Sequence, residues 1–321
     1  MLRPDGKGLA ALAVDLDEDL KPEVYVANDM AANFLFTRTR PQHLSPIDNG
    51  DKLYVDLGEE MGAAKSDIGY VEASMGIAAG DFDRNGHPDL FVTHFFAQKN
   101  TLYRNLGKMQ FEDVSKRSRI ATLSHELLGF GTVAFDYDRD GWLDLIVTNG
   151  HVFGPNIVPS GMRPQLVRNV GKGQFEDVTD FAGEYFEKLW LGRGIAGGDF
   201  DNDGDLDFGI THLDQPFALV RNDTETGRHF LGIELATVDR SSAVGGRVVV
   251  KTAEGEQVIP VVAGGTYVST NDSRLLFGLG DQTRSVEVRV YWPSGTRQEL
   301  TLEVDRYWLI REGHKAIPTN D

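Results

Sequence analysis

The chain contains no cysteine among its 321 residues, which excludes disulfide bonds, thiolate metal sites and a cysteine nucleophile. It has no apolar run of about 18 residues, so we predict no transmembrane helix and no membrane insertion. Basic residues are few: 32 Lys and Arg stand against 49 Asp and Glu, and the formal net charge is −17. A balance of this sign disfavours nucleic acid and anionic membranes as partners and favours cations.

Two further absences concern targeting and catalysis. The start of the chain has neither a long apolar segment nor a small-residue cleavage site, so we predict no signal peptide in it. The motifs GxSxG and HExxH and a phosphate-binding loop are also absent. We therefore assign no catalytic residue and no organic cofactor site, and we expect the protein not to be an enzyme.

An aspartate-rich motif occurs four times in the chain, and glycine is abundant, at 36 residues. The copies begin at Asp15, Asp81, Asp136 and Asp199, so they recur after 66, 55 and 63 residues. Three copies read DFDRNGHPDL, DYDRDGWLDL and DFDNDGDLDF, and the first copy, DLDEDLKPEV, is degenerate. Self-similarity of this kind is the sequence signature of a repeat architecture.

The flanks of the motif repeat as well. A short apolar, glycine-containing segment precedes each copy, and a segment rich in β-branched and aromatic residues follows it. Further on, NTLYRNLGKMQFEDVS at 100–115 matches PQLVRNVGKGQFEDVT at 164–179, and a third copy begins at 217–223. Each unit therefore predicts about four short antiparallel strands, as in a β-propeller blade. We predict an all-β fold in which residues 1–227 form about four blades, as a small closed ring or an incomplete one.

The pattern changes after the connector at 223–227. Residues 228–315 alternate apolar and polar positions, as in SVEVRVYW and QELTLEV, and this period of two is typical of half-buried strands. We predict a second, small β-sandwich or barrel there, with a hairpin turn at 293–295 and Trp292 in core or turn packing. Residues 37–70 are polar and irregular in pattern, and we predict a loop.

The spacing of the acidic residues predicts cation sites. Side-chain oxygens stand at places 1, 3, 5 and 9 of each motif, counted from its first Asp, and glycine at place 6 permits a left-handed turn. The carbonyl of place 7 adds a further ligand. The candidate ligands are Asp81, Asp83, Asn85, His87 and Asp89; Asp136, Asp138, Asp140, Trp142 and Asp144; Asp199, Asp201, Asp203, Asp205 and Asp207; and, for a weaker site, Asp15, Asp17, Asp19 and Glu23. His87, Trp142 and Asp205 would offer only their carbonyls.

A shell of six or seven hard oxygen atoms favours calcium over zinc or copper, and magnesium stays an alternative. We expect three calcium ions and a fourth, weaker one, because Leu20 replaces the glycine in the first motif. The four motifs hold 17 of the 49 acidic residues, so four such ions would bring the net charge to −9. The competing interpretation is that Asp and Gly only mark hairpin turns. An EF-hand is excluded, because no helical pattern flanks the motifs.

At the level of families, GDFDRNGHPDLFVT, FDYDRDGWLDLIVTN and GGDFDNDGDLDFGIT resemble FG-GAP/VCBS repeats. AVGGRVVV, GGTYVST, LLFGLGD and VRVYWPSG resemble the ASPIC/UnbV domain. Together they resemble the cartilage acidic protein family, including its bacterial members. The resemblance implies a calcium-binding propeller of commonly seven blades, located outside the cell or in the cell envelope, with adhesion or protein and glycan binding as its role. Only four motifs are present here, so we expect an N-terminally truncated or split product.

One position in each unit suggests an alternative function. Asn28, His94, Asn149 and His212 each stand five residues after place 9, and Arg193 occupies a position that is apolar in the other units. If His94, His212 and Arg193 meet in a central channel, the protein would be an enzyme or an accessory of natural-product biosynthesis. If they do not, we expect hydrogen bonds to blade backbone.

Overall fold

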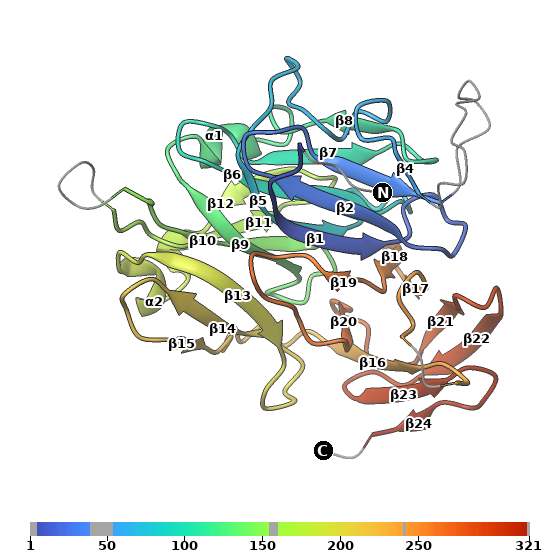
Figure 1. The fold of residues 1–321 in the computed structure, drawn as a ribbon. Coiled ribbons are helices and arrows are strands. Elements are labelled where there is room, and N and C mark those ends of the chain that lie inside the picture. The colour runs from blue at the N-terminus through green and yellow to red at the C-terminus, as the bar shows by residue number, and fades with distance from the viewer. Residues whose placement is uncertain (1–4, 39–53, 154–159, 240–241, 320–321) are drawn as a thin grey trace.

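The computed structural model describes residues 5–38, 54–153, 160–239 and 242–319 (Figure 1). Strands dominate these ranges, and the helices are two short α-helices and one 3-10 turn. Among the residues so described, no helix has the length and apolar character needed to cross a membrane. The predicted all-β class is confirmed.

Four antiparallel sheets form propeller-type blades in chain order. Blade 1 contains β1 (Gly8–Val14), β2 (Glu23–Asn28), β3 (Phe34–Thr37) and β4 (Val55–Asp56). Blade 2 contains β5 (Ser74–Gly80), β6 (Asp89–His94), β7 (Thr101–Asn105) and β8 (Phe111–Asp113), followed by α1 (Ile120–Ser124). Blade 3 contains β9 (Gly129–Phe135), β10 (Asp144–Asn149), β11 (Gln165–Asn169) and β12 (Phe175–Asp177), followed by η1 (Thr179–Phe181) and α2 (Glu184–Glu187). Blade 4 contains β13 (Gly192–Gly198), β14 (Asp207–His212) and β15 (Ala218–Val220).

The blades pack face to face through apolar side chains. The innermost strands lie beside one another in the order β1, β5, β9, β13. A cluster of buried apolar residues lies between each pair of neighbouring blades. Between blades 2 and 3, for example, the rings of Phe82 and Phe175 meet edge to face at 5.9 Å. Blades 2 and 3 lie between two neighbours, and their second strands, β6 and β10, are therefore buried at every position.

Residues after the connector form a β-sandwich. One sheet contains β16 (Phe230–Ala236), β20 (Leu275–Gly278), β23 (Tyr307–Arg311) and β24 (Ile317–Pro318). The other contains β17 (Arg247–Thr252), β18 (Gly255–Pro260), β21 (Val286–Tyr291) and β22 (Arg297–Leu302). Their inner faces share one core, in which Trp292 is fully buried, so its predicted packing role is confirmed. β21 and β22 pair across the predicted hairpin turn.

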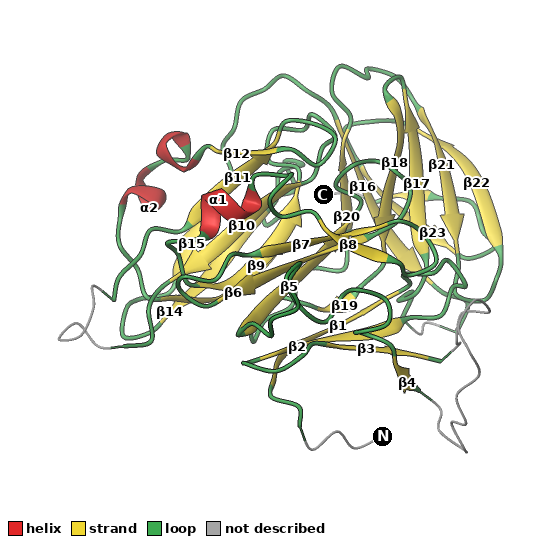
Figure 2. Ribbon diagram, turned by 90° about the horizontal axis from the view of Figure 1, so that it is seen from above, coloured by secondary structure: helices red, strands yellow, loops and turns green. Residues whose placement is uncertain are grey.

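A short segment of the sandwich region joins the blades. β19 (Ala263–Gly264) pairs with the free side of β1, where Leu12 stands opposite Gly264. Beyond it, the amide of Thr132 donates to Oγ1 of Thr266 at 3.1 Å, and the amide of Gly197 donates to Oδ1 of Asn271 at 2.9 Å. Segment 263–272 therefore crosses the inner strands of blades 1, 3 and 4, and Figures 1 and 2 show the C-terminal sheets beside the blades.

Three details of the prediction were wrong. Part of the expected loop at 37–70 is ordered: β4 pairs with β3, and Leu57 and Met61 are buried in the core of blade 1, while 39–53 lies outside the described residues. The strand expected through QVIPVVAGGTYVST ends at Pro260, because the chain leaves the sandwich to reach β1. The fourth blade has three strands instead of four in the described part of the chain.

Candidate metal centres

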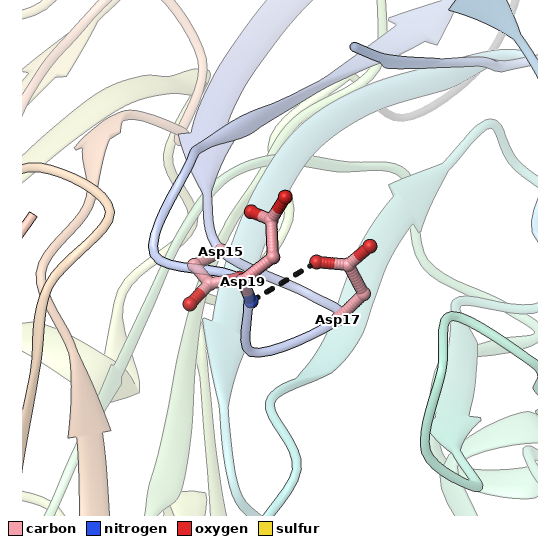
Figure 3. A group of neighbouring side chains, drawn as sticks. All are labelled: Asp15, Asp17 and Asp19. Atoms are coloured by element: carbon pink, nitrogen blue, oxygen red, sulfur yellow. Dashed lines mark hydrogen bonds between the residues drawn. The ribbon is translucent and has the colours of Figure 1, made fainter. Parts of the chain in front are cut away.

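Each of the four aspartate motifs forms the loop between the first and second strands of its blade, at equivalent positions. In each loop, three carboxylates offer oxygen atoms that lie within 4.8 Å of one another. The groups are Asp15, Asp17 and Asp19; Asp81, Asp83 and Asp89; Asp136, Asp138 and Asp144; and Asp199, Asp201 and Asp203. Figure 3 shows the first group, in which the amide of Asp19 donates to Oδ1 of Asp17 at 3.2 Å.

The loops curl because two of their residues adopt left-handed backbone conformations. Place 6 has a φ of 91° at Gly86, and Leu20, which replaces glycine in the first loop, still has a φ of 66°. Place 4 is left-handed as well, with a φ of 56° at Arg84 and 57° at Arg139. The carboxylate of place 1 stabilises this curl, since Asp81 accepts the amides of Asn85 at 3.0 Å and Gly86 at 2.8 Å.

The ninth place closes each loop against its own blade. In the third loop, Asp144 accepts the amide of Tyr137 at 3.0 Å and that of Asn169 at 2.7 Å. Asp89 and Asp207 make the same pair of contacts in their loops. In the first loop, Glu23 accepts the amide of Leu16 at 2.9 Å, but it is not grouped with the other carboxylates.

Burial makes these carboxylates unfavourable as bare anions. It raises the pKa of Asp15 and of Asp81 to about 6, and that of Glu23 to about 8. Burial also raises the pKa of Asp89 and Asp144 well above the usual range, and neighbouring negative charges add to the effect. A bound cation opposes both causes, because it favours the ionised form.

One buried oxygen in the fourth loop has no partner among the described residues. Oδ1 of Asp199 makes no hydrogen bond, whereas Oδ2 of the same carboxylate accepts the Gly204 amide at 2.9 Å and the Tyr307 hydroxyl at 2.5 Å. A buried carboxylate oxygen without a donor is costly unless a cation reaches it. The donor set of the loops is entirely oxygen, so the residues present fit a hard divalent cation.

Side chains at the fifth place point partly toward other partners. Oδ1 of Asn85 accepts the His87 amide at 2.8 Å, and its Nδ2 donates to the Asn105 carbonyl at 2.9 Å. Asp140 accepts from Arg168 at 3.0 Å and is absent from its carboxylate group, whereas Asp203 belongs to the group of its loop. The ligand roles predicted for all four loops, including those of the ninth-place Asp207 and Glu23, stay predictions.

Side chains at the seventh place contact the preceding loop, a feature that the sequence analysis missed. Nδ1 of His87 lies 2.7 Å from Oε1 of Glu18. The guanidinium of Arg84 lies over the Trp142 ring, 3.9 Å from its centroid. Arg139 donates to both oxygens of Asp205, at 2.8 and 2.7 Å. Places 4 and 7 therefore link successive loops, a role separate from the carbonyl ligation predicted for place 7.

An arginine in the third strand, or directly after it in blade 4, also reaches the third-place carboxylate of its own loop. Arg104 contacts Asp83 at 2.5 Å, Arg168 contacts Asp138 at 2.8 Å, and Arg221 contacts Asp201 at 3.4 Å. The repeated YRN and VRN triplets were the sequence signal for this contact.

The three residues proposed for a channel site do not meet. Within the described residues, His94 is buried beside Ser74, at 3.4 Å, and Glu72, at 3.6 Å. His212 stacks on Trp190 with ring centroids 4.5 Å apart, and its Nδ1 lies 2.6 Å from the Pro216 carbonyl.

Arg193 lies over the ring of Phe130, 4.0 Å from its centroid, and donates to the carbonyl of Gly150 at 3.1 Å. Nδ2 of Asn28 and of Asn149 donates to carbonyls of the same blade, on Ala32 and Arg163. His94, His212 and Arg193 thus have separate surroundings and do not form the single site that the channel hypothesis required. The hydrogen-bonding role fits Asn28 and Asn149, with partners in their own blades rather than in neighbouring ones.

Comparison with known proteins agrees with the sequence resemblance. An FG-GAP-like repeat family matches residues 81–147, and the family described as ASPIC and UnbV matches residues 237–317. Cartilage acidic protein 1 of Xenopus tropicalis is 27% identical over 292 residues, which cover 85% of this chain and 40% of the relative. The Homo sapiens protein of the same name is 25% identical over 286 residues, covering 85% and 39%. The chain therefore spans about two fifths of the length of these relatives.

A solved structure was also matched. It concerns recognition of non-reducing terminal N-acetylglucosamine by an Agrocybe aegerita lectin, with a TM-score of 0.36 and 15% identity. The match covers 92% of this chain and 80% of that one.

Proposed function

We propose that this chain, which carries an FG-GAP-like repeat and an ASPIC/UnbV domain and is homologous to cartilage acidic protein 1 over most of its length, is a calcium-stabilised interaction scaffold. It acts outside the cytoplasm and binds a protein or a glycan. One observation carries the calcium part of the proposal: a group of three carboxylates, always including places 1 and 3, recurs at the same loop in four successive blades.

The residues that would hold the ions are the carboxylates of places 1 and 3 together with the grouped carboxylate of place 5 or place 9. The role of the ions would be structural, since they would neutralise buried carboxylates at the edge of each blade. A cation that binds only the folded state stabilises it by mass action, by about 2.7 kcal/mol at a concentration one hundred times the dissociation constant. Modules with sites of this kind bind calcium at the concentrations found outside cells, which supports the proposed location.

The test is elemental analysis of the purified protein, paired with thermal unfolding in calcium and in chelator. We expect three or four calcium ions per chain and a lower melting temperature in chelator. The variant Asp144→Asn should lose one ion, because it weakens a single loop. Asp223→Asn, which removes an exposed carboxylate of the connector, is the matched control and should keep all ions. If the protein binds no calcium and chelator leaves its melting temperature unchanged, the calcium proposal is wrong and the loops are only turns.

A further inference from the structure

Blade 4 ends with an uncovered strand edge. In the described part of the chain, no strand pairs with the outer edge of β15, whereas β8 and β12 cover the equivalent edges of β7 and β11. Both covering strands have the sequence Phe-Glu-Asp, followed by Val and then Ser or Thr. These two strands show what type of segment fits at this position.

In blade 3, the covering strand also fills the space toward blade 2. The ring of Phe175 is fully buried in one apolar cluster, and its amide donates to the Ser118 carbonyl at 3.0 Å. The cluster has members from both blades, among them Phe82 and Val114 of blade 2 and Leu145 and Val167 of blade 3. A phenylalanine from the fourth strand therefore closes the interface between two blades.

The equivalent space between blades 3 and 4 is a cavity. It measures about 620 Å³, and the residues at the four corresponding motif positions line it: Tyr137, Val178, Phe208 and Val220. Phe181 also lines the cavity and is 90% exposed. The position that Phe175 occupies in blade 3 therefore has no occupant in blade 4 among the described residues.

Blade 4 is otherwise joined to blade 3 as the other blades are joined. Nδ2 of Asn222 donates to the Tyr137 carbonyl at 3.0 Å. Asn169 makes the same contact with the Phe82 carbonyl, at 2.8 Å. The blade is thus in its ordinary position, and the cavity does not arise from a displaced sheet.

The open edge also has the chemistry of a strand receptor. Leu219, in β15, is 65% exposed, and Phe217, which directly precedes β15, is 63% exposed. In blade 3, Arg168 stands opposite Glu176 in the register, and Arg221 is its equivalent in blade 4. An incoming strand in the same register would place an acidic residue opposite Arg221.

We propose that blade 4 is completed by a strand from another polypeptide, which pairs with the outer edge of β15 and inserts an aromatic side chain into the cavity between blades 3 and 4. The partner segment is extended, with an aromatic residue followed by two acidic residues and an aliphatic one. Main-chain hydrogen bonds at a sheet edge supply affinity in this mode of recognition, and the pocket for the side chain supplies specificity. This inference deepens the scaffold proposal by naming a partner surface, but it does not depend on calcium.

The experiment uses the full chain and a fluorescent synthetic peptide, GKGQFEDVTD, which copies residues 171–180. We expect saturable binding by fluorescence anisotropy. A peptide with alanine in place of phenylalanine should bind about tenfold more weakly or worse, because burial of the ring is lost. Absence of binding by the first peptide, or equal binding of the two, would contradict the proposal.

Two substitutions test the edge itself. Leu219→Pro removes a main-chain donor at the open edge. In blade 2 the equivalent amide, that of Leu102, donates to Oγ of Ser115 beside the covering strand at 2.9 Å. The substitution to proline should abolish peptide binding, while Leu219→Ala, the matched control, should retain it. Should Leu219→Pro fail to fold by circular dichroism, Ala182→Trp replaces it, since this residue lines the cavity and a larger ring fills it.

Further outcomes separate this inference from its alternatives. If the protein is a dimer that Leu219→Pro converts to a monomer, a second copy covers the edge and the proposed partner is wrong. Calcium content is measured on the same samples. Bound calcium without peptide binding would overturn only this inference, and peptide binding without calcium would overturn only the calcium scaffold.

Discussion

At the scale of single residues, His94 is a fully buried titratable group inside blade 2. His94 occupies a position that is Asn28 in blade 1 and Asn149 in blade 3. Burial lowers the pKa of His94 to about 3, and it raises the pKa of the adjacent Glu72 to about 7. The imidazole is therefore neutral in the folded protein at ordinary pH, and Nε2 has no hydrogen-bond partner among the described residues.

This predicts an acid sensitivity that one substitution removes. The pKa of His94 is lower in the folded than in the unfolded chain, so its contribution to stability is complete above about pH 6.5 and is lost as pH falls toward 3. His94→Asn should therefore gain stability relative to the original protein on acidification, by up to about 1.4 kcal/mol per pH unit in that window.

The measurement is urea unfolding at a series of pH values. Glu72 acts in the opposite sense, since its raised pKa favours the folded state at low pH, but it is present in both proteins. His125→Asn, at an exposed histidine, is the matched control. Parallel pH profiles for His94→Asn and the original protein would show that His94 does not titrate in this way.

Single residues also show how far sequence reasoning reaches. The grouping of places 1 and 3 followed from side-chain types and spacing alone, as did the turn at place 6. The left-handed conformation of place 4 did not, because Glu18, Arg84, Arg139 and Asn202 have no common chemistry that predicts a positive φ. Hydrogen bonds of the whole loop fix that conformation.

At the scale of elements, the loops form a chain of contacts along one edge of the blades. From the second loop on, place 7 of a loop touches place 4 of the loop before it. The last place 4, Asn202, accepts a hydrogen bond from Arg274 of the sandwich at 2.7 Å. The sequence predicted the strands and loops of each blade, because these depend on local periodicity. It did not predict the links between loops, which depend on how blades stack.

A double-mutant cycle measures one of these links. Arg139 and Asp205 form a two-bond ion pair with side-chain exposures of 17% and 6%. Replacing each residue by alanine, singly and together, should give a coupling energy of about 1–3 kcal/mol in urea unfolding, because the pair is largely shielded from water.

The exposed pair of Arg221 and Asp223 is the comparison, and its coupling energy should be clearly smaller, because water and salt screen both charges. If the two cycles give the same coupling energy, then the contact between loops adds nothing beyond an ordinary surface ion pair.

At the scale of the whole molecule, the blades and the C-terminal region share one sheet, because β19 pairs with β1. Residues 1–227 and 228–315 are distinguishable in the sequence because they differ in periodicity. β19 is not, since a two-residue strand carries no periodic signal. The described contacts of segment 263–272 with β1, β9 and β13 predict that the molecule unfolds as one unit.

Calorimetry of glycine variants tests this. A side chain at Gly264 would collide with the Ala11 carbonyl, whereas one at Gly280 meets open space, and both residues have a positive φ. Gly264→Ala should therefore separate the single transition into two or lower its temperature, at a cost of about 1–3 kcal/mol. Gly280→Ala carries the same backbone strain and should keep one transition. Two transitions in the unsubstituted protein would contradict the shared structure.

The pairing of β1 with β19 also dictates when the molecule can be completed. The first inner strand receives its neighbour only after Gly264 has been synthesised, some 250 residues after Leu12. At about 5–20 residues per second, translation of that interval takes roughly 13–50 s. During this time the nascent blades present an unpaired inner edge, and unpaired strand edges are prone to aggregation. Among the described blade strands, β1 is therefore the earliest to be made and the last to gain its partner.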